Sequence, residues 1–127
     1  MFVCDTHPLV WFLTDNPKLS LTAAESLKRA QAGDAIAYVP TIVLSEFLSL
    51  ATRDRVPWER LFEFLLRLGG TQGFSFADLD LEVFSRMMYI VMASPQPRPD
   101  LELHDLSILA TALLLSAKLI TRDRKLR

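Results

Sequence analysis

Acidic side chains are the residues of this sequence best suited to chemistry, and four stand far apart along the chain: Asp5, Glu46, Asp105 and Asp123. Carboxylate oxygens are the ligands that hard cations such as Mg²⁺ and Mn²⁺ prefer, and the sequence lacks the set of cysteines and histidines that zinc would take. Such an ion can lower the pKa of a bound water and stabilise a leaving oxygen, so hydrolysis would need no Ser-His-Asp triad. If the fold brings these acids together, they predict a metal-dependent hydrolase.

Three of the acids also have an ordinary structural explanation. Asp105 is placed to lie in the first turn of a helix, where its carboxylate would meet free N–H groups. Asp5 and Asp123 are typical of turns at the ends of strands. Taken singly, each of the three is therefore explained without a metal ion.

Glu46 is harder to explain as a structural residue. Its helical neighbours three and four positions away include Ile42, Val43 and Leu50, so it lies on the apolar side of its helix. An ionised carboxylate on a buried face is strongly unfavourable unless a partner compensates its charge. Two explanations stay open for Glu46, namely a metal ion and a buried arginine.

The two histidines and the single cysteine give weaker signals. His7 and His104 have neither the spacing of a metal-binding pair nor that of a HExxH helix, so we expect a capping or surface role for both. Cys4 is expected to be a small buried strand residue, and a lone cysteine fits a reducing cytoplasm. No glycine-rich phosphate loop is present, which counts against a nucleoside-triphosphate enzyme.

Length and composition fit a single domain over residues 1–127. Half of the residues are hydrophobic and 23% are charged, so the chain can bury enough apolar surface to offset its ordering entropy. The net charge of −1 argues against a general positive field for nucleic acid, although it is compatible with a local basic patch. The acid at position 5 argues against a secretory signal, and the apolar run 106–117 is shorter than the ~20 residues of a membrane helix. We expect a cytoplasmic protein with no membrane segment.

The apolar patterning alternates between strands and helices. Expected strands cover residues 2–4, 35–39, 74–76 and 118–121. Expected helices begin at Pro8 and cover residues 20–32, 41–52, 57–68, 81–93 and 106–117, with a proline-rich loop at 94–99. This order predicts an α/β fold with a parallel sheet covered on both faces. All four acids can then face the crevice at the carboxyl ends of the strands.

Four short motifs resemble those of the PIN domains, and among them the toxin ribonucleases of VapC type from bacterial toxin–antitoxin pairs. They occur in the family's order and cover nearly the whole chain. The motifs are Val3-Cys4-Asp5-Thr6-His7-Pro8-Leu9-Val10-Trp11, Val43-Leu44-Ser45-Glu46-Phe47, Leu103-His104-Asp105-Leu106-Ser107-Ile108-Leu109-Ala110-Thr111-Ala112 and Leu119-Ile120-Thr121-Arg122-Asp123.

The resemblance implies a PIN-like three-layer fold, with a central parallel sheet of four to five strands flanked by helices. It implies endonucleolytic hydrolysis of RNA with Mg²⁺ or Mn²⁺, leaving a 5′-phosphate. Thr6 or Thr121 would orient water or a carboxylate by hydrogen bonding. Asp100 and Glu102 are reserve acids for which we favour a solvated loop edge. The metal ligands and catalytic residues would be Asp5, Glu46, Asp105 and Asp123.

The chain departs from the family pattern at two places. Leu106 stands where many relatives have arginine, and the sequence stops at Arg127 without the family's usual last segment. We expect the C-terminal segment to be truncated or short, which bears on a fifth strand and on the position of Asp123.

Basic residues near the acids are candidates for contacts with RNA phosphates, and a solvated charged surface is the alternative. The candidates are Arg53, Arg55, Arg122, Arg124 and Lys125.

The apolar content of helices 58–68 and 84–92 exceeds what one buried face requires. Together with the resemblance, this predicts a homodimer and a groove for an antitoxin protein, and burial in a tight core is the alternative.

Two other functional classes compete with the nuclease. One is a phosphoacceptor receiver domain, which wants adjacent acids after its first strand, whereas Asp5 stands alone before Thr6. The other is a catalytically silent PIN-like binding module, which would tolerate loss of the acids.

Overall fold

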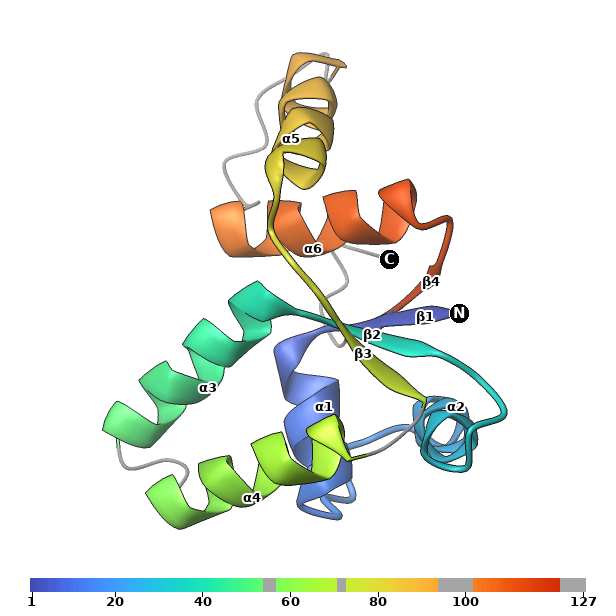
Figure 1. Ribbon diagram of the computed structural model, residues 1–127, viewed down its shortest axis with the longest axis vertical. Coiled ribbons are helices and arrows are strands. Elements are labelled where there is room, and N and C mark those ends of the chain that lie inside the picture. The colour runs from blue at the N-terminus through green and yellow to red at the C-terminus, as the bar shows by residue number, and fades with distance from the viewer. Residues whose placement is uncertain (54–56, 71–72, 94–101, 122–127) are drawn as a thin grey trace.

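Four parallel strands form the centre of the computed structural model, which describes residues 1–53, 57–70, 73–93 and 102–121 (Figure 1). The strands are β1 (Phe2–Cys4), β2 (Ala37–Pro40), β3 (Phe74–Ala77) and β4 (Lys118–Ile120). They pair in the order β3-β2-β1-β4, so the first strand lies inside the sheet. Its Val3 is aligned with Tyr38 of β2 on one side and with Leu119 of β4 on the other. All pairs are parallel, so the strands end at one edge of the sheet.

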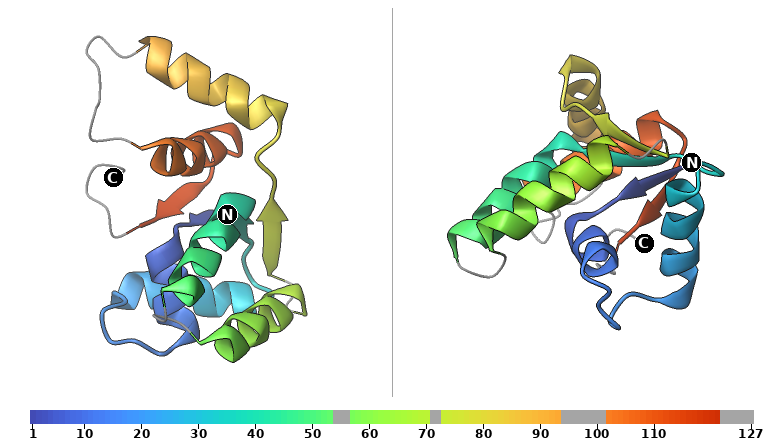
Figure 2. Two further views of the ribbon diagram at one scale, coloured as in Figure 1. Left: turned by 90° about the vertical axis from the view of Figure 1, so that its left-hand side faces the viewer. Right: turned by 60° about the horizontal axis from the view of Figure 1, so that its bottom comes forward.

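Six helices surround this sheet in the described part of the chain. They are α1 (Thr6–Leu13), α2 (Leu21–Gln31), α3 (Thr41–Thr52), α4 (Trp58–Gly69), α5 (Leu81–Ala93) and α6 (Leu103–Leu114). Figures 1 and 2 show α5 and α6 on one side of the sheet and α1, α2 and α4 on the other, while α3 leads away from the end of β2. The predicted three-layer α/β fold with a parallel sheet is therefore confirmed.

The core divides into two clusters. The larger one is centred on fully buried residues of β1 and β2, such as Val3 and Val39, and it includes Leu9, Leu27 and Phe47 from the surrounding helices. The smaller one joins α5 to α6 through residues that include Val83, Met87 and Leu106. Because α5 packs mainly on α6, the rest of its surface is left without cover in the single chain.

Helix α6 differs from the helix predicted over residues 106–117. It begins at Leu103, so His104 and Asp105 belong to its first turn, where a carboxylate is favourable. It ends after Leu114, because Ser116 has a left-handed φ of 51° that a helix cannot continue through. Ala117 N–H then donates to the carbonyl of Ala112 at 2.9 Å, which closes the helix end. Because α6 begins three residues earlier than predicted, its first turn, with His104 and Asp105, lies at the carboxyl edge of the sheet.

None of the helices in the described ranges combines the length and apolar character that a membrane span requires. The sheet formed by the described residues has four strands, which is within the predicted range of four to five.

Gly73, just before β3, gives a test of this packing. A Cβ at this position would fall onto the backbone carbonyl of Ala30 at the end of α2, and backbone cannot move aside as a flexible side chain does. We expect Gly73→Ala to lower the free energy of unfolding by about 2–3 kcal/mol. Gly69 is the matched control, because a Cβ there meets nothing within 4 Å and Gly69→Ala should be neutral or stabilising by up to about 1 kcal/mol. Urea unfolding of both variants measures this, and equal stabilities would contradict it.

Candidate metal centre

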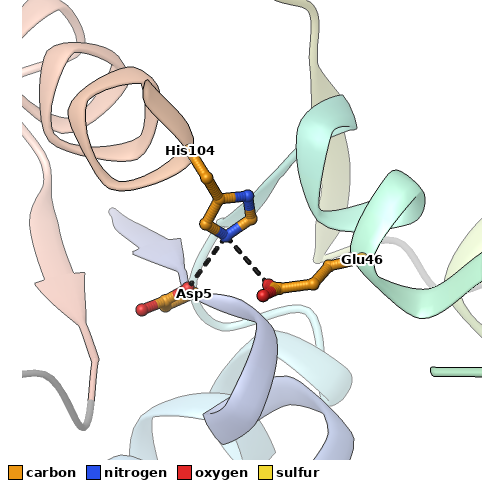
Figure 3. Close-up of side chains that lie close together, drawn as sticks. All are labelled: Asp5, Glu46 and His104. Carbon is orange, nitrogen blue, oxygen red and sulfur yellow. Dashed lines mark ion pairs between the residues drawn. The ribbon is translucent and has the colours of Figure 1, made fainter. Parts of the chain in front are cut away.

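Three elements bring their side chains together at the carboxyl edge of the sheet. Asp5 directly follows β1, Glu46 lies on α3, and His104 lies in the first turn of α6. Figure 3 shows the three side chains pointing toward one another from these elements. One ligand atom from each residue lies within 4.8 Å of the others, which makes them the candidate metal-binding group among the described residues.

Asp5 is the most firmly held member of this group. Its residue is only 6% exposed, and its Oδ1 accepts a 2.7 Å hydrogen bond from the backbone N–H of Thr6. Its Oδ2 accepts another of 2.7 Å from the hydroxyl of Thr121, the residue that follows β4. The backbone N–H of Asp5 donates to the carbonyl of Ile120, so the pairing of β1 with β4 fixes the position of Asp5 relative to Thr121. Both threonines named as supporting residues thus lie beside the carboxylate.

His104 occupies the space between the two carboxylates. Its Nε2 lies 2.9 Å from Oε2 of Glu46 and 3.8 Å from Oδ1 of Asp5. The hydroxyl of Thr6 is 3.5 Å from the same nitrogen. The expected capping or surface role for His104 is therefore wrong, because the imidazole faces the acids. Its place beside Asp105 in the third motif was the one available signal.

Glu46 is less buried than its apolar neighbours suggested. Its side chain is 36% exposed, so one side of the carboxylate is open to solvent. Its ion-pair partner is His104, so the negative charge of Glu46 is compensated by an imidazole and not by a buried arginine. The exposed carboxylate of Glu46 beside the buried one of Asp5 leaves room for water or substrate to bind a metal ion there.

Hydrogen bonding dominates the electrostatics of the group. Burial raises the pKa of Asp5, but the His104 imidazole 3.8 Å away and the hydrogen bonds from Thr121 and Thr6 outweigh it and hold this pKa below its ordinary value. The hydrogen bond from His104 likewise lowers the pKa of Glu46. The carboxylates of Asp5 and Glu46 in turn raise the pKa of His104 from 6.5 to about 10. Without a metal ion, the group is a protonated imidazole between two carboxylates.

Cys4 lies next to this group in sequence and takes no part in it. Its side chain is fully buried, as predicted, and desolvation followed by the charge of Asp5 raises the pKa of its thiol to about 12. The thiol therefore stays protonated and packs as a small apolar side chain.

The other predicted site residues are placed less directly. Asp105 is half-buried in the first turn of α6 and lies outside the three-residue group. Glu102 is exposed at the N-cap of α6, and Arg53 is exposed at the end of α3. The predicted residues that fall outside the described part of the chain are Asp100, Asp123, Arg55, Arg122, Arg124 and Lys125.

The described group fits a divalent cation. Two ligand atoms that are each about 2.1 Å from one ion lie roughly 3.0–4.2 Å apart, depending on whether they are adjacent or opposite. The distances of 2.9 Å and 3.8 Å from Nε2 to the two carboxylates are close to this range. Two carboxylates and one imidazole can hold Mn²⁺, and the carboxylates alone can hold Mg²⁺ with waters.

Comparisons with known proteins agree with this fold. The sequence model of the family described as PIN domain matches residues 2–127. Among solved structures, the chain is similar to VapBC2 from Rickettsia felis in a crystal structure bound to a DNA fragment from their promoter. The TM-score is 0.67 and the identity 16%, over 98% of this chain and 89% of the other, so the likeness is one of fold. A search of curated proteins gave no match.

The ion pairs of His104 give a pH-dependent prediction for the metal-free protein. Folding raises the pKa of His104 from 6.5 to about 10, so the protonated imidazole stabilises the fold fully below pH 6.5 and less as the pH rises toward 10. We expect His104→Gln to lower the free energy of unfolding by on the order of 2 kcal/mol near pH 6, and by much less near pH 10. Urea unfolding in EDTA at both pH values measures the difference. An equal loss at both would contradict the ion-pair account.

Proposed function

Because the chain belongs to the PIN domain family, we propose that it is a metal-dependent endoribonuclease, and that it acts as the VapC-type toxin of a bacterial toxin–antitoxin pair. The observation that carries the proposal is the convergence of Asp5 and Glu46, from separate elements, at the carboxyl edge of the sheet. Membership in this family also excludes the receiver-domain alternative. The silent binding module stays as the second candidate, because acids alone do not demonstrate turnover.

In the proposed mechanism, Asp5 and Glu46 would hold Mg²⁺ or Mn²⁺ together with Asp105 and Asp123. Such an ion would supply a more acidic water and charge neutralisation at the scissile phosphate. Thr121 and the backbone of Thr6 hold Asp5 by hydrogen bonds of 2.7 Å, so its oxygens keep their direction when the substrate enters. The open side of Glu46 faces solvent, where an RNA strand can approach.

RNA would be held by phosphate contacts from Arg53, Arg55, Arg122, Arg124 and Lys125. Support for this comes from the exposure of Arg53, which directly follows α3, the helix that carries Glu46. The net charge of −1 means that such contacts must be local.

The proposed partners are an antitoxin and a second copy of this chain, in the cytoplasm where RNA is available. Large apolar side chains on α5 are exposed in the single chain, among them Met92 at 79% and Val91 at 59%. A groove of about 260 Å³ runs between α5 and α6, and the apolar residues that line it include Phe84, Met88, Val91, Met92, Leu103 and Leu106. One of its lining residues, Leu103, directly precedes His104 in the sequence. The similar solved structure, VapBC2, carries the name of a toxin–antitoxin pair, which supports an antitoxin as one of the partners.

Cleavage of labelled RNA tests the catalytic proposal. We expect wild-type protein to cut mixed RNAs with Mn²⁺ or Mg²⁺ and to stop in EDTA. Asp5→Asn keeps the size of the side chain but removes the charge that attracts the ion, so the rate should fall at least about 100-fold. Glu25→Gln is the matched control, because Glu25 is an exposed acid on α2 and its loss should leave the rate unchanged. RNA binding without cleavage would favour the silent module, and scission in EDTA would contradict the metal.

The oligomeric state tests the exposed apolar face of α5. Met88 is 48% exposed, and charge at Met88 and Val91 should be unfavourable only if this face is covered by another chain. We expect a dimer by light scattering, with the double variant Met88→Glu and Val91→Glu shifted to monomer. Leu21→Glu on α2 is the control, because Leu21 is 84% exposed and lies on the opposite side of the sheet. A wild-type monomer at high concentration would contradict the dimer.

A further inference from the structure

The imidazole of His104 has no part in the mechanism proposed above, yet it faces the acids more directly than Asp105 does. Its Nε2 lies 2.9 Å from Glu46, 3.8 Å from Asp5 and 3.5 Å from the hydroxyl of Thr6. One ring nitrogen carries at most one proton and can donate one good hydrogen bond. One N–H cannot donate to all three oxygens at once. An ion bound by Nε2 together with the two carboxylates would satisfy more of these groups.

We propose that His104 is a ligand of the divalent ion at this site, and that its nitrogen makes the site prefer Mn²⁺ over Mg²⁺. The inference rests on the proposed function, in which Asp5 and Glu46 bind such an ion. Mg²⁺ takes oxygen ligands and keeps several waters, whereas imidazole suits later metals more than Mg²⁺, and Mn²⁺ lies between these classes. An imidazole in an otherwise oxygen-based group therefore acts as a selectivity element.

The first turns of α6, which carry His104, are reinforced by two buried hydroxyl groups. The Ser107 hydroxyl donates to the His104 carbonyl at 2.7 Å, and the Thr111 hydroxyl donates to the Ser107 carbonyl at 2.8 Å. Both hydroxyl-bearing residues are buried, so the face of α6 that carries them lies inside the protein. Only the side chains of His104 and Glu46 then need to adjust around an ion, because Asp5 is already held.

A different role for the same residue makes the opposite prediction. If His104 served only as an internal cation that balances the two carboxylates, it would compete with the metal. Removing it would then tighten the binding of both ions. As a ligand, it should instead weaken Mn²⁺ binding when removed and change Mg²⁺ binding little.

Spectroscopy of bound Mn²⁺ tests direct ligation. We expect electron spin-echo modulation from an imidazole ¹⁴N in the wild-type protein. The modulation should disappear in His104→Ala and persist in His7→Ala, the matched control that removes the only other histidine. Circular dichroism confirms that each variant is folded. Mn²⁺ bound without nitrogen modulation would overturn the inference while leaving the proposed nuclease intact.

Calorimetric titration of Mn²⁺ and Mg²⁺ tests selectivity. The ratio of the Mg²⁺ to the Mn²⁺ dissociation constant should fall about tenfold or more in His104→Ala. In His104→Asp, an oxygen ligand replaces the nitrogen, so binding should persist with the preference moved toward Mg²⁺. Tighter binding of both ions in His104→Ala would identify a competing cation and overturn the inference. Absence of any metal binding by the wild-type protein would overturn both this inference and the proposed function.

Discussion

The buried charge of Asp5 is the constraint on which the rest of this site depends. A carboxylate that is 6% exposed is strongly unfavourable without hydrogen bonds or an opposite charge. The compensation comes from three places: the first turn of α1, the residue after β4 and the first turn of α6. Each depends on a different part of the fold, so the pairing of β1 with β4 and the packing of α6 over β1 are also conditions for a charged Asp5.

The parallel sheet explains why the group forms at this edge. Helices cover both faces of the sheet, so the ends of the strands are where polar groups meet solvent. β1 lies between β2 and β4, and α3 begins directly where β2 ends at Pro40. Glu46 is therefore carried from the neighbouring strand to the side of Asp5, while Val43 and Phe47 on the same helix remain buried in the main core. Packing of α3 thus fixes the direction of the carboxylate.

Much of this arrangement could be predicted from the sequence. Apolar runs bounded by turn residues located β1, β2 and β4 to within a few residues, and helical spacing placed Glu46 beside the buried positions of α3. The contacts of His104 with Asp5 and Glu46 could not be predicted, because they depend on where α6 crosses β1. The spacing of residues along the sequence does not determine that tertiary contact. The pattern also placed the start of α6 at position 106, since apolar periodicity is weak in a first turn that carries polar residues. The sequence therefore predicts a capping role for this histidine, whereas in the fold it faces two acids.

The start of α6 also limits what His104 and Asp105 can do together. Consecutive residues of a helix point about 100° apart, so His104 and Asp105 leave the first turn of α6 in different directions. His104 is directed at Asp5 and Glu46, and Asp105 correspondingly lies outside their group. If both residues bind the same ion, Asp105 must reach it from another side than His104 does, or through a water molecule. A site with an imidazole on one side and a carboxylate on the other is broader than a single cluster of acids, and it offers an extended phosphate backbone more than one point of contact.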